Sequence, residues 1–240
     1  MIPIRDNVAS SRRPVVNWLL IAINVGVFLW QLFMMPAYAV QQGHRMYGFT
    51  PAYLFGSLGG YALIPAWLTV FTSQFRHAGF SHIFSNMLYL WVFGDNIEDE
   101  LGHLRYLGFY LSSGAVGALL HGMMNMNSTT PLIGASGAIA GILGAYFILY
   151  PKARIRSLVP VFIIFFTVNV PAVYFLGAWF VLQVFNNSIA TAVSTTAYLA
   201  HIGGFVVGAV VGIWLRQKRR HQWELIPPEA DHPDDNILRQ

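Results

Sequence analysis

Four polar side chains that lie in apolar stretches have the types needed for acyl transfer. They are Ser136, in a Gly-Ala-Ser-Gly segment, and His82, Asn86 and His201. A serine hydroxyl becomes a nucleophile when a neutral imidazole within hydrogen-bond reach takes its proton. His82 and Asn86 are four residues apart, so on a helix they lie one turn apart on one face. Together with a backbone N–H at Ser136, they can donate hydrogen bonds to a developing oxyanion.

Each of these features also has a purely structural explanation. A Gly-x-Ser-Gly segment in a chain with 22 glycines is also typical of helix packing. A single histidine in an apolar stretch often bonds a carbonyl group of the next helix. We interpret His77, at the start of the stretch that contains His82, in this way. The hypothesis of catalysis therefore depends on whether the fold brings the four candidate residues together.

The composition is that of a membrane protein. Of 240 residues, 55% are hydrophobic and 10% are charged, whereas roughly a quarter of the residues of a soluble domain are charged. The chain has no cysteine, which excludes disulfides, thiolate metal sites and a cysteine nucleophile, and we expect no metal and no cofactor. The net charge is +4, but the basic residues sit at the ends of apolar runs. Anionic lipid is therefore the expected partner, and nucleic acid is not.

The apolar runs predict an all-α polytopic membrane protein. Six runs are long enough to cross a bilayer: 15–35, 77–93, 106–124, 132–150, 170–185 and 197–215. The segment 158–169 lies between two prolines and is predicted to be an interfacial connection. Residues 36–76 are too apolar for a free loop and are predicted to be half submerged. We therefore divide the chain into a cytoplasmic N-terminus (1–14), a six-span domain (15–215) and a disordered cytoplasmic tail (216–240).

The charges predict the orientation. Six spans place both termini on one side, and every Lys and Arg except Arg45 and Arg76 then lies on that side, which the positive-inside rule makes cytoplasmic. The second, fourth and sixth spans all enter from outside. The four candidate residues therefore share one level in the outer part of the membrane.

Small residues predict which spans touch. They recur every four residues in the fourth and sixth spans, as Gly137, Gly141 and Ala145 and as Gly204, Gly208 and Gly212. Such stripes let two helix backbones approach closely. His201 lies on the face of the second stripe and Ser136 lies beside the first. Contact between these two spans would bring the hydroxyl and the imidazole together.

Three segments resemble the rhomboid family of intramembrane serine proteases: HAGFSHIFSN at 77–86, GASGAIAG at 134–141 and AHIGGFVVG at 200–208. The resemblance implies a six-helix bundle in a prokaryotic cell membrane that cleaves single-span or other transmembrane proteins. It also implies Ser136 as nucleophile, His201 as general base, and His82 and Asn86 with the Ser136 N–H as oxyanion hole. In some members an aromatic residue one turn after the serine stacks on the histidine, and here this position is Ala140.

Three other functions are possible for such a sequence. A catalytically silent relative would bind membrane proteins for quality control, but such proteins usually lack the serine or the histidine. A transporter would favour Asp or Glu inside the spans, and a metalloprotease would need His-Glu-x-x-His. All 10 acidic residues are placed on the cytoplasmic side by the predicted topology. The sequence therefore predicts a Ser136–His201 dyad without a carboxylate.

Overall fold

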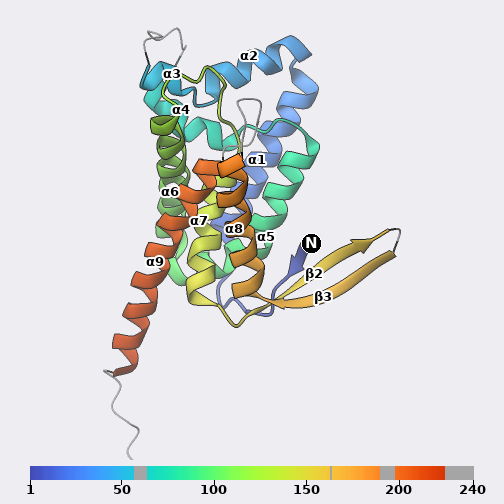
Figure 1. Cartoon of the computed structure of the whole chain (residues 1–240), viewed down its shortest axis with the longest axis vertical. Helices are drawn as coiled ribbons and strands as arrows, with labels where there is room; N and C mark the ends of the chain where they lie inside the picture. Colours follow the sequence, from blue (N-terminus) through green and yellow to red (C-terminus); the bar gives the residue numbers. More distant parts are fainter. Residues whose placement is uncertain (57–63, 163, 190–197, 225–240) are drawn as a thin grey trace, which may run out of the picture.

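The computed structural model describes residues 1–56, 64–162, 164–189 and 198–224. Within them, the helices that coincide with the predicted spans form a bundle (Figure 1). These helices are α1 (Val15–Met34), α5 (Phe80–Leu101), α6 (His103–Met124), α7 (Ser136–Leu149), α8 (Ala172–Ile189) and α9 (Tyr198–Glu224). By length and composition α1, α6, α8 and α9 can each cross a membrane. α7 is apolar but has only 14 residues, and α5 ends in an acidic segment.

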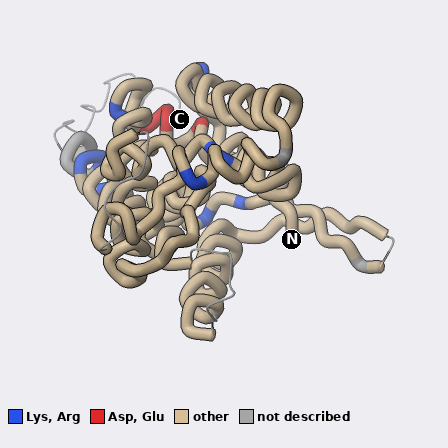
Figure 2. The backbone as a smooth tube through the Cα atoms, turned by 90° about the horizontal axis from the view of Figure 1, so that it is seen from above, with Lys and Arg blue, Asp and Glu red and all other residues tan. Residues whose placement is uncertain are grey.

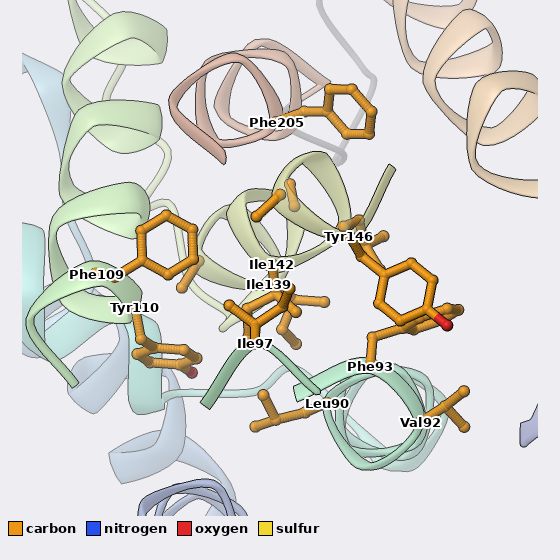
Figure 3. Packing of buried hydrophobic residues seen from close by; sticks show 14 of the residues in the cluster. Leu90, Val92, Phe93, Ile97, Phe109, Tyr110, Ile139, Ile142, Tyr146 and Phe205 are labelled. Carbon is orange, nitrogen blue, oxygen red and sulfur yellow. The ribbon is translucent and has the colours of Figure 1, made fainter. Parts of the chain in front are cut away.

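α7 lies at the centre of the bundle, in contact with α5, α6, α8 and α9. Every residue from Gly137 to Tyr146 is buried, which is typical of a helix that is surrounded by other helices. Figure 3 shows large side chains of the neighbouring helices, among them Leu90, Phe93 and Tyr110, packed around Ile139 and Ile142 of α7. The central helix is therefore held on all sides, and its first residue is Ser136.

The predicted contact between the two small-residue stripes is present. α7 and α9 share the most extensive contact among the described elements. A methyl group on Gly204 would collide with the carbonyl oxygen of Gly137, and one on Gly208 would collide with that of Gly141. Only glycine fits at these positions, because a backbone atom of the facing helix occupies the space.

The segment between α1 and α5 folds over the end of the bundle where α7 begins (Figure 1). The structure describes its residues 36–56 and 64–76. They form α2 (Ala37–Tyr47), α3 (Pro51–Leu54), α4 (Ala66–Thr72) and the 3-10 helix η1 (Ser73–Phe75). Phe49 and Leu132 exchange two backbone hydrogen bonds, of 2.9 and 2.8 Å, and the Gly134 N–H donates to the Ser73 carbonyl at 2.9 Å. This segment therefore holds the chain that leads into α7. Its predicted depth in the membrane stays a prediction.

The acidic end of α5 anchors the N-terminal segment. The Glu98 carboxylate accepts hydrogen bonds from the backbone N–H groups of Val16 (2.9 Å) and Asn17 (2.7 Å), in the first turn of α1. Asp99 accepts from the N–H groups of Ser11 and Arg12. Glu98 thus binds first-turn amide groups that have no partner within α1, and Asp99 binds amide groups of the segment before it.

The structure contains a small antiparallel sheet with the strand order β1-β2-β3. The expectation of an all-α fold is wrong in this respect. Its strands are β1 (Ile2–Arg5), β2 (Arg154–Val161) and β3 (Ile164–Pro171). The segment predicted to be an interfacial connection is therefore a β-hairpin. The prolines suggested an irregular connection, but Pro160 lies beyond the residues of β2 that pair with β1, where a strand edge tolerates proline. The many β-branched residues of β2 and β3 and the aromatic residues of β3 favour the strands.

The predicted tail also needs a correction at its start. α9 continues to Glu224, so residues 216–224 are helical. Lys, Arg and Gln are good helix formers, and basic residues near the C-terminal end of a helix are favoured by its dipole. The rest of the predicted tail, 225–240, lies outside the described residues.

Candidate active site

Ser136 and His201 meet at the contact between α7 and α9. The Ser136 Oγ lies 2.7 Å from the His201 Nε2, which is hydrogen-bond distance. Ser136 is the first residue of α7, where backbone N–H groups have no partner inside the helix. The pair therefore combines a hydroxyl, a base and free amide donors at one point.

Gln183 of α8 completes the hydrogen bonding of the imidazole. Its Oε1 lies 2.8 Å from the His201 Nδ1, and its side chain is buried. An amide oxygen can only accept a hydrogen bond, so in this arrangement Nδ1 carries the proton and Nε2 is left to accept from Ser136. Sequence reasoning missed Gln183. The available signal was a lone polar residue in an otherwise apolar span.

Trp179, one turn before Gln183 on α8, covers the face of His201. The two ring centroids are 5.9 Å apart, with 32° between the planes. The position one turn after Ser136 is the buried Ala140. The aromatic neighbour of the histidine is thus supplied by α8 and not by α7. Two contacts to His201 therefore come from this one helix.

His82 and Asn86 of α5 line the same cavity as Ser136 and His201, with a volume of about 640 Å³. Gly134 lies beside them with φ +120°, and a methyl group there would be 2.7 Å from the His82 Nε2. Glycine therefore lets the chain before Ser136 pass close to the imidazole. The Asn86 Nδ2 is buried and has no hydrogen-bond partner among the described residues. This donor is available to a group that enters the cavity.

His77 lies outside this cavity. It is fully buried, and its ring packs edge-on against His82 with centroids 5.1 Å apart. Its carbonyl oxygen accepts a hydrogen bond of 2.9 Å from Gln31 of α1. Its contacts therefore support the ring of His82 and join α1 to the start of α5.

The acidic side chains closest in sequence to the site bind elsewhere. Asp95, Glu98 and Asp99 interact with the N-terminal segment or the first turn of α1, and Glu100 pairs with Arg219 of α9. Among the described residues, His201 has no hydrogen bond to a carboxylate, and no three His, Cys, Asp or Glu side chains are grouped as metal ligands would be. The partner of the base is an amide.

Comparison with known proteins identifies the class. A family model described as the Rhomboid domain matches residues 64–218, so the chain belongs to the rhomboid family. Together with its apolar helices, this makes it a multi-pass membrane protein.

Individual proteins that are similar to this chain are also named as rhomboid or rhomboid-like proteins. Rhomboid protein 1, mitochondrial, of Saccharomyces cerevisiae is 30% identical over 82% of this chain and 52% of its own length. Rhomboid-like protein 11, chloroplastic, of Arabidopsis thaliana is 26% identical over 89% of this chain and 70% of its own. The putative rhomboid protease YdcA of Bacillus subtilis is 31% identical over 57% of this chain and 62% of its own. The chain thus spans about half of the yeast protein. Because relatives come from organelles as well as a bacterium, the expected prokaryotic cell membrane is not supported.

Proposed function

We propose that this protein is a serine endopeptidase that hydrolyses peptide bonds in or near transmembrane segments of other membrane proteins. The observation that carries the proposal is the 2.7 Å contact between Ser136 and His201 at the edge of a cavity. Two bacterial relatives support it by their names, the putative rhomboid protease YdcA and the rhomboid protease GluP. No cofactor takes part in this chemistry.

The geometry supports a two-step acyl transfer. The Ser136 Oγ attacks the carbonyl carbon of the scissile bond while its proton passes to the His201 Nε2. The carbonyl oxygen becomes an oxyanion and accepts hydrogen bonds from the Ser136 N–H, the Asn86 Nδ2 and His82. His201 returns the proton to the leaving amine, and the C–N bond breaks. Water, activated by His201, then hydrolyses the acyl-enzyme and regenerates Ser136.

The direct test is covalent labelling by a fluorophosphonate, which reacts with activated serines. The detergent-purified protein should be labelled at Ser136, as shown by peptide mass spectrometry, and Ser136→Ala should remove the label. A folded protein that resists the probe and leaves a single-span substrate intact would instead favour a silent rhomboid-like binding factor.

We further propose six spans, with both termini in the cytoplasm and the cavity open to the outer face. The helices that coincide with the predicted spans support this topology, and so does the distribution of basic residues. An impermeant thiol reagent should label a cysteine at Asn127 from outside and one at Lys152 only from inside. The natural chain has no cysteine to interfere. External labelling at position 152 would overturn the orientation.

Gln183 acts in this scheme as a positioning residue. Its Oε1 holds the Nδ1 proton and stabilises the imidazolium that forms during attack. A hydrogen bond to a charged group is worth ~1.5–3 kcal/mol, so Gln183→Met should slow fluorophosphonate labelling roughly 10- to 100-fold. Gln183→Glu, which keeps an acceptor at the same reach, is the matched control and should label much faster than Gln183→Met. Equal rates for Gln183→Met and the natural protein would remove Gln183 from the mechanism.

A further inference from the structure

Exposed arginines form a row on the β-sheet, at the opposite end of the bundle from the cavity. Along β2 the side chains alternate: Ile155 and Ser157 are fully buried, whereas Arg154 and Arg156 are exposed. This is the period of a strand that packs one face on the bundle and exposes the other. Arg5 of β1 pairs directly with Arg156, so it lies on the exposed face as well. We call Arg5, Arg154 and Arg156 the arginine row.

None of the arginines of the row forms an ion pair in the described structure. Like charges directly opposite each other on neighbouring strands destabilise a sheet. Even so, none of the three guanidinium groups has a hydrogen bond or an ion pair with a described side chain. The row lines a pocket of about 420 Å³ together with Asp6, Asn7 and Asn169. An anion in this pocket would relieve the repulsion.

Asp6 does not form an ion pair with the row, because its carboxylate makes its hydrogen bonds to other side chains. It accepts a hydrogen bond of 2.9 Å from the Asn96 Nδ2 and another from the Tyr146 hydroxyl. Burial raises the pKa of the Asp6 carboxyl above its usual value, although the hydrogen bond from the Tyr146 hydroxyl opposes the shift. The pocket therefore presents guanidinium groups to an incoming group, and phosphate oxygens match their fork of donors.

The rest of the hairpin is apolar and exposed. Phe162 at its tip is 99% exposed, and Ile164, Phe165 and Phe166 of β3 are 58%, 61% and 50% exposed. The hairpin projects sideways from the bundle (Figure 1), and basic segments lie where it joins the bundle (Figure 2). If the helices cross the bilayer, the hairpin runs along the membrane surface. The hairpin is therefore basic where it joins the bundle and apolar at its tip. This pattern is typical of a segment that lies in the interface of an anionic membrane.

We propose that the arginine row binds the phosphate headgroup of an anionic phospholipid, whose acyl chains lie against the apolar part of the β2–β3 hairpin. The positive charge of the row favours an anionic headgroup. The exposed aromatic residues of β3 contact the acyl chains and therefore favour a lipid over free phosphate. Under the proposed topology the site faces the cytoplasmic leaflet, which carries anionic lipid. Binding at this site is independent of proteolysis.

The test is native mass spectrometry of the delipidated full chain titrated with phosphatidylglycerol or phosphatidylcholine. The natural protein should bind phosphatidylglycerol more tightly. Arg154→Gln with Arg156→Gln should weaken this binding roughly 30-fold, as expected for the loss of two direct hydrogen-bonded contacts to the phosphate worth ~1 kcal/mol each. Lys152→Gln with Arg216→Gln removes the same charge from side chains that do not line the pocket and is the matched control. The expected change is less than about threefold, because salt screens the attraction between these exposed charges and the headgroup. Equal losses in the two double variants, or no preference for phosphatidylglycerol, would overturn the site.

Two further arms identify the source of the phosphate. Phe165→Ser with Phe166→Ser should weaken phosphatidylglycerol binding while leaving the arginine row intact. Soluble glycerol phosphate should compete only at concentrations far above those of the lipid. Competition by glycerol phosphate at similar concentrations, with no effect of the hairpin variant, would show a site for free phosphate and contradict the lipid assignment. All substituted side chains are exposed, and thermal unfolding in detergent checks that each variant folds.

Discussion

Ser136→Ala should lower the rate of peptide-bond cleavage by roughly 10⁴-fold or more, and His201→Ala should lower it by a similar factor. The double variant should be no slower than either single one, because the hydroxyl and the imidazole act as a unit. The measurement is cleavage of a single-span reporter protein in proteoliposomes, with fluorophosphonate labelling as a second readout. Activity should also fall in acid, since a protonated His201 cannot accept the serine proton.

The control for this experiment is Ser112→Ala on α6. The Ser112 hydroxyl donates only to carbonyl groups of its own helix and lies outside the cavity. This variant should cleave the reporter at the natural rate. Full activity in a folded Ser136→Ala protein would end the serine-protease proposal. Additive losses from Ser136→Ala and His201→Ala would show that the two side chains do not act together.

Gly208→Ala should destabilise the bundle by at least ~3 kcal/mol, at the upper end of the usual cost of overpacking. The added methyl group collides with the carbonyl oxygen of Gly141, and a backbone atom cannot rotate away as a side chain can. α7 and α9 must therefore separate, which would also part Ser136 from His201. The measurement is the midpoint of unfolding in mixed detergent and dodecyl sulfate, together with the rate of fluorophosphonate labelling.

Gly108→Ala on α6 is the matched control. A methyl group there meets no atom within 4 Å, so this variant should be neutral or more stable by up to about 1 kcal/mol, because alanine favours the helix. If Gly208→Ala unfolded at the same midpoint as Gly108→Ala, the close contact between α7 and α9 would be wrong.

The sequence predicts the elements that depend on local pattern. Apolar runs place the helices of the bundle, and the stripes through Gly141 and Gly208 predict the pairing of α7 with α9. The approach of Ser136 to His201 follows from that pairing. Gln183 could not be predicted in this way, because no stripe indicates how α8 is rotated against α9. Its contact with His201 depends on that rotation.

The sheet was missed for a different reason. Proline signals the end of a helix wherever it occurs, but a strand tolerates it only on an edge, and pairing decides which part of a strand is an edge. The pairing of β1 with β2 joins residues 2–5 to residues 156–158, far apart in the chain. A local pattern does not contain this information.

The shortness of α7 has a consequence for the permeability of the membrane. Its 14 residues extend only ~21 Å, whereas the hydrocarbon core is ~30 Å thick. Because α7 is encircled by other helices, lipid does not fill the difference under the proposed topology, and the polar cavity above Ser136 can hold the water that hydrolysis consumes. Below Ser136, ten successive buried residues close the path. The protein would thus contain a closed cavity that admits water about a third of the way into the hydrocarbon core without providing a path for ions across the membrane.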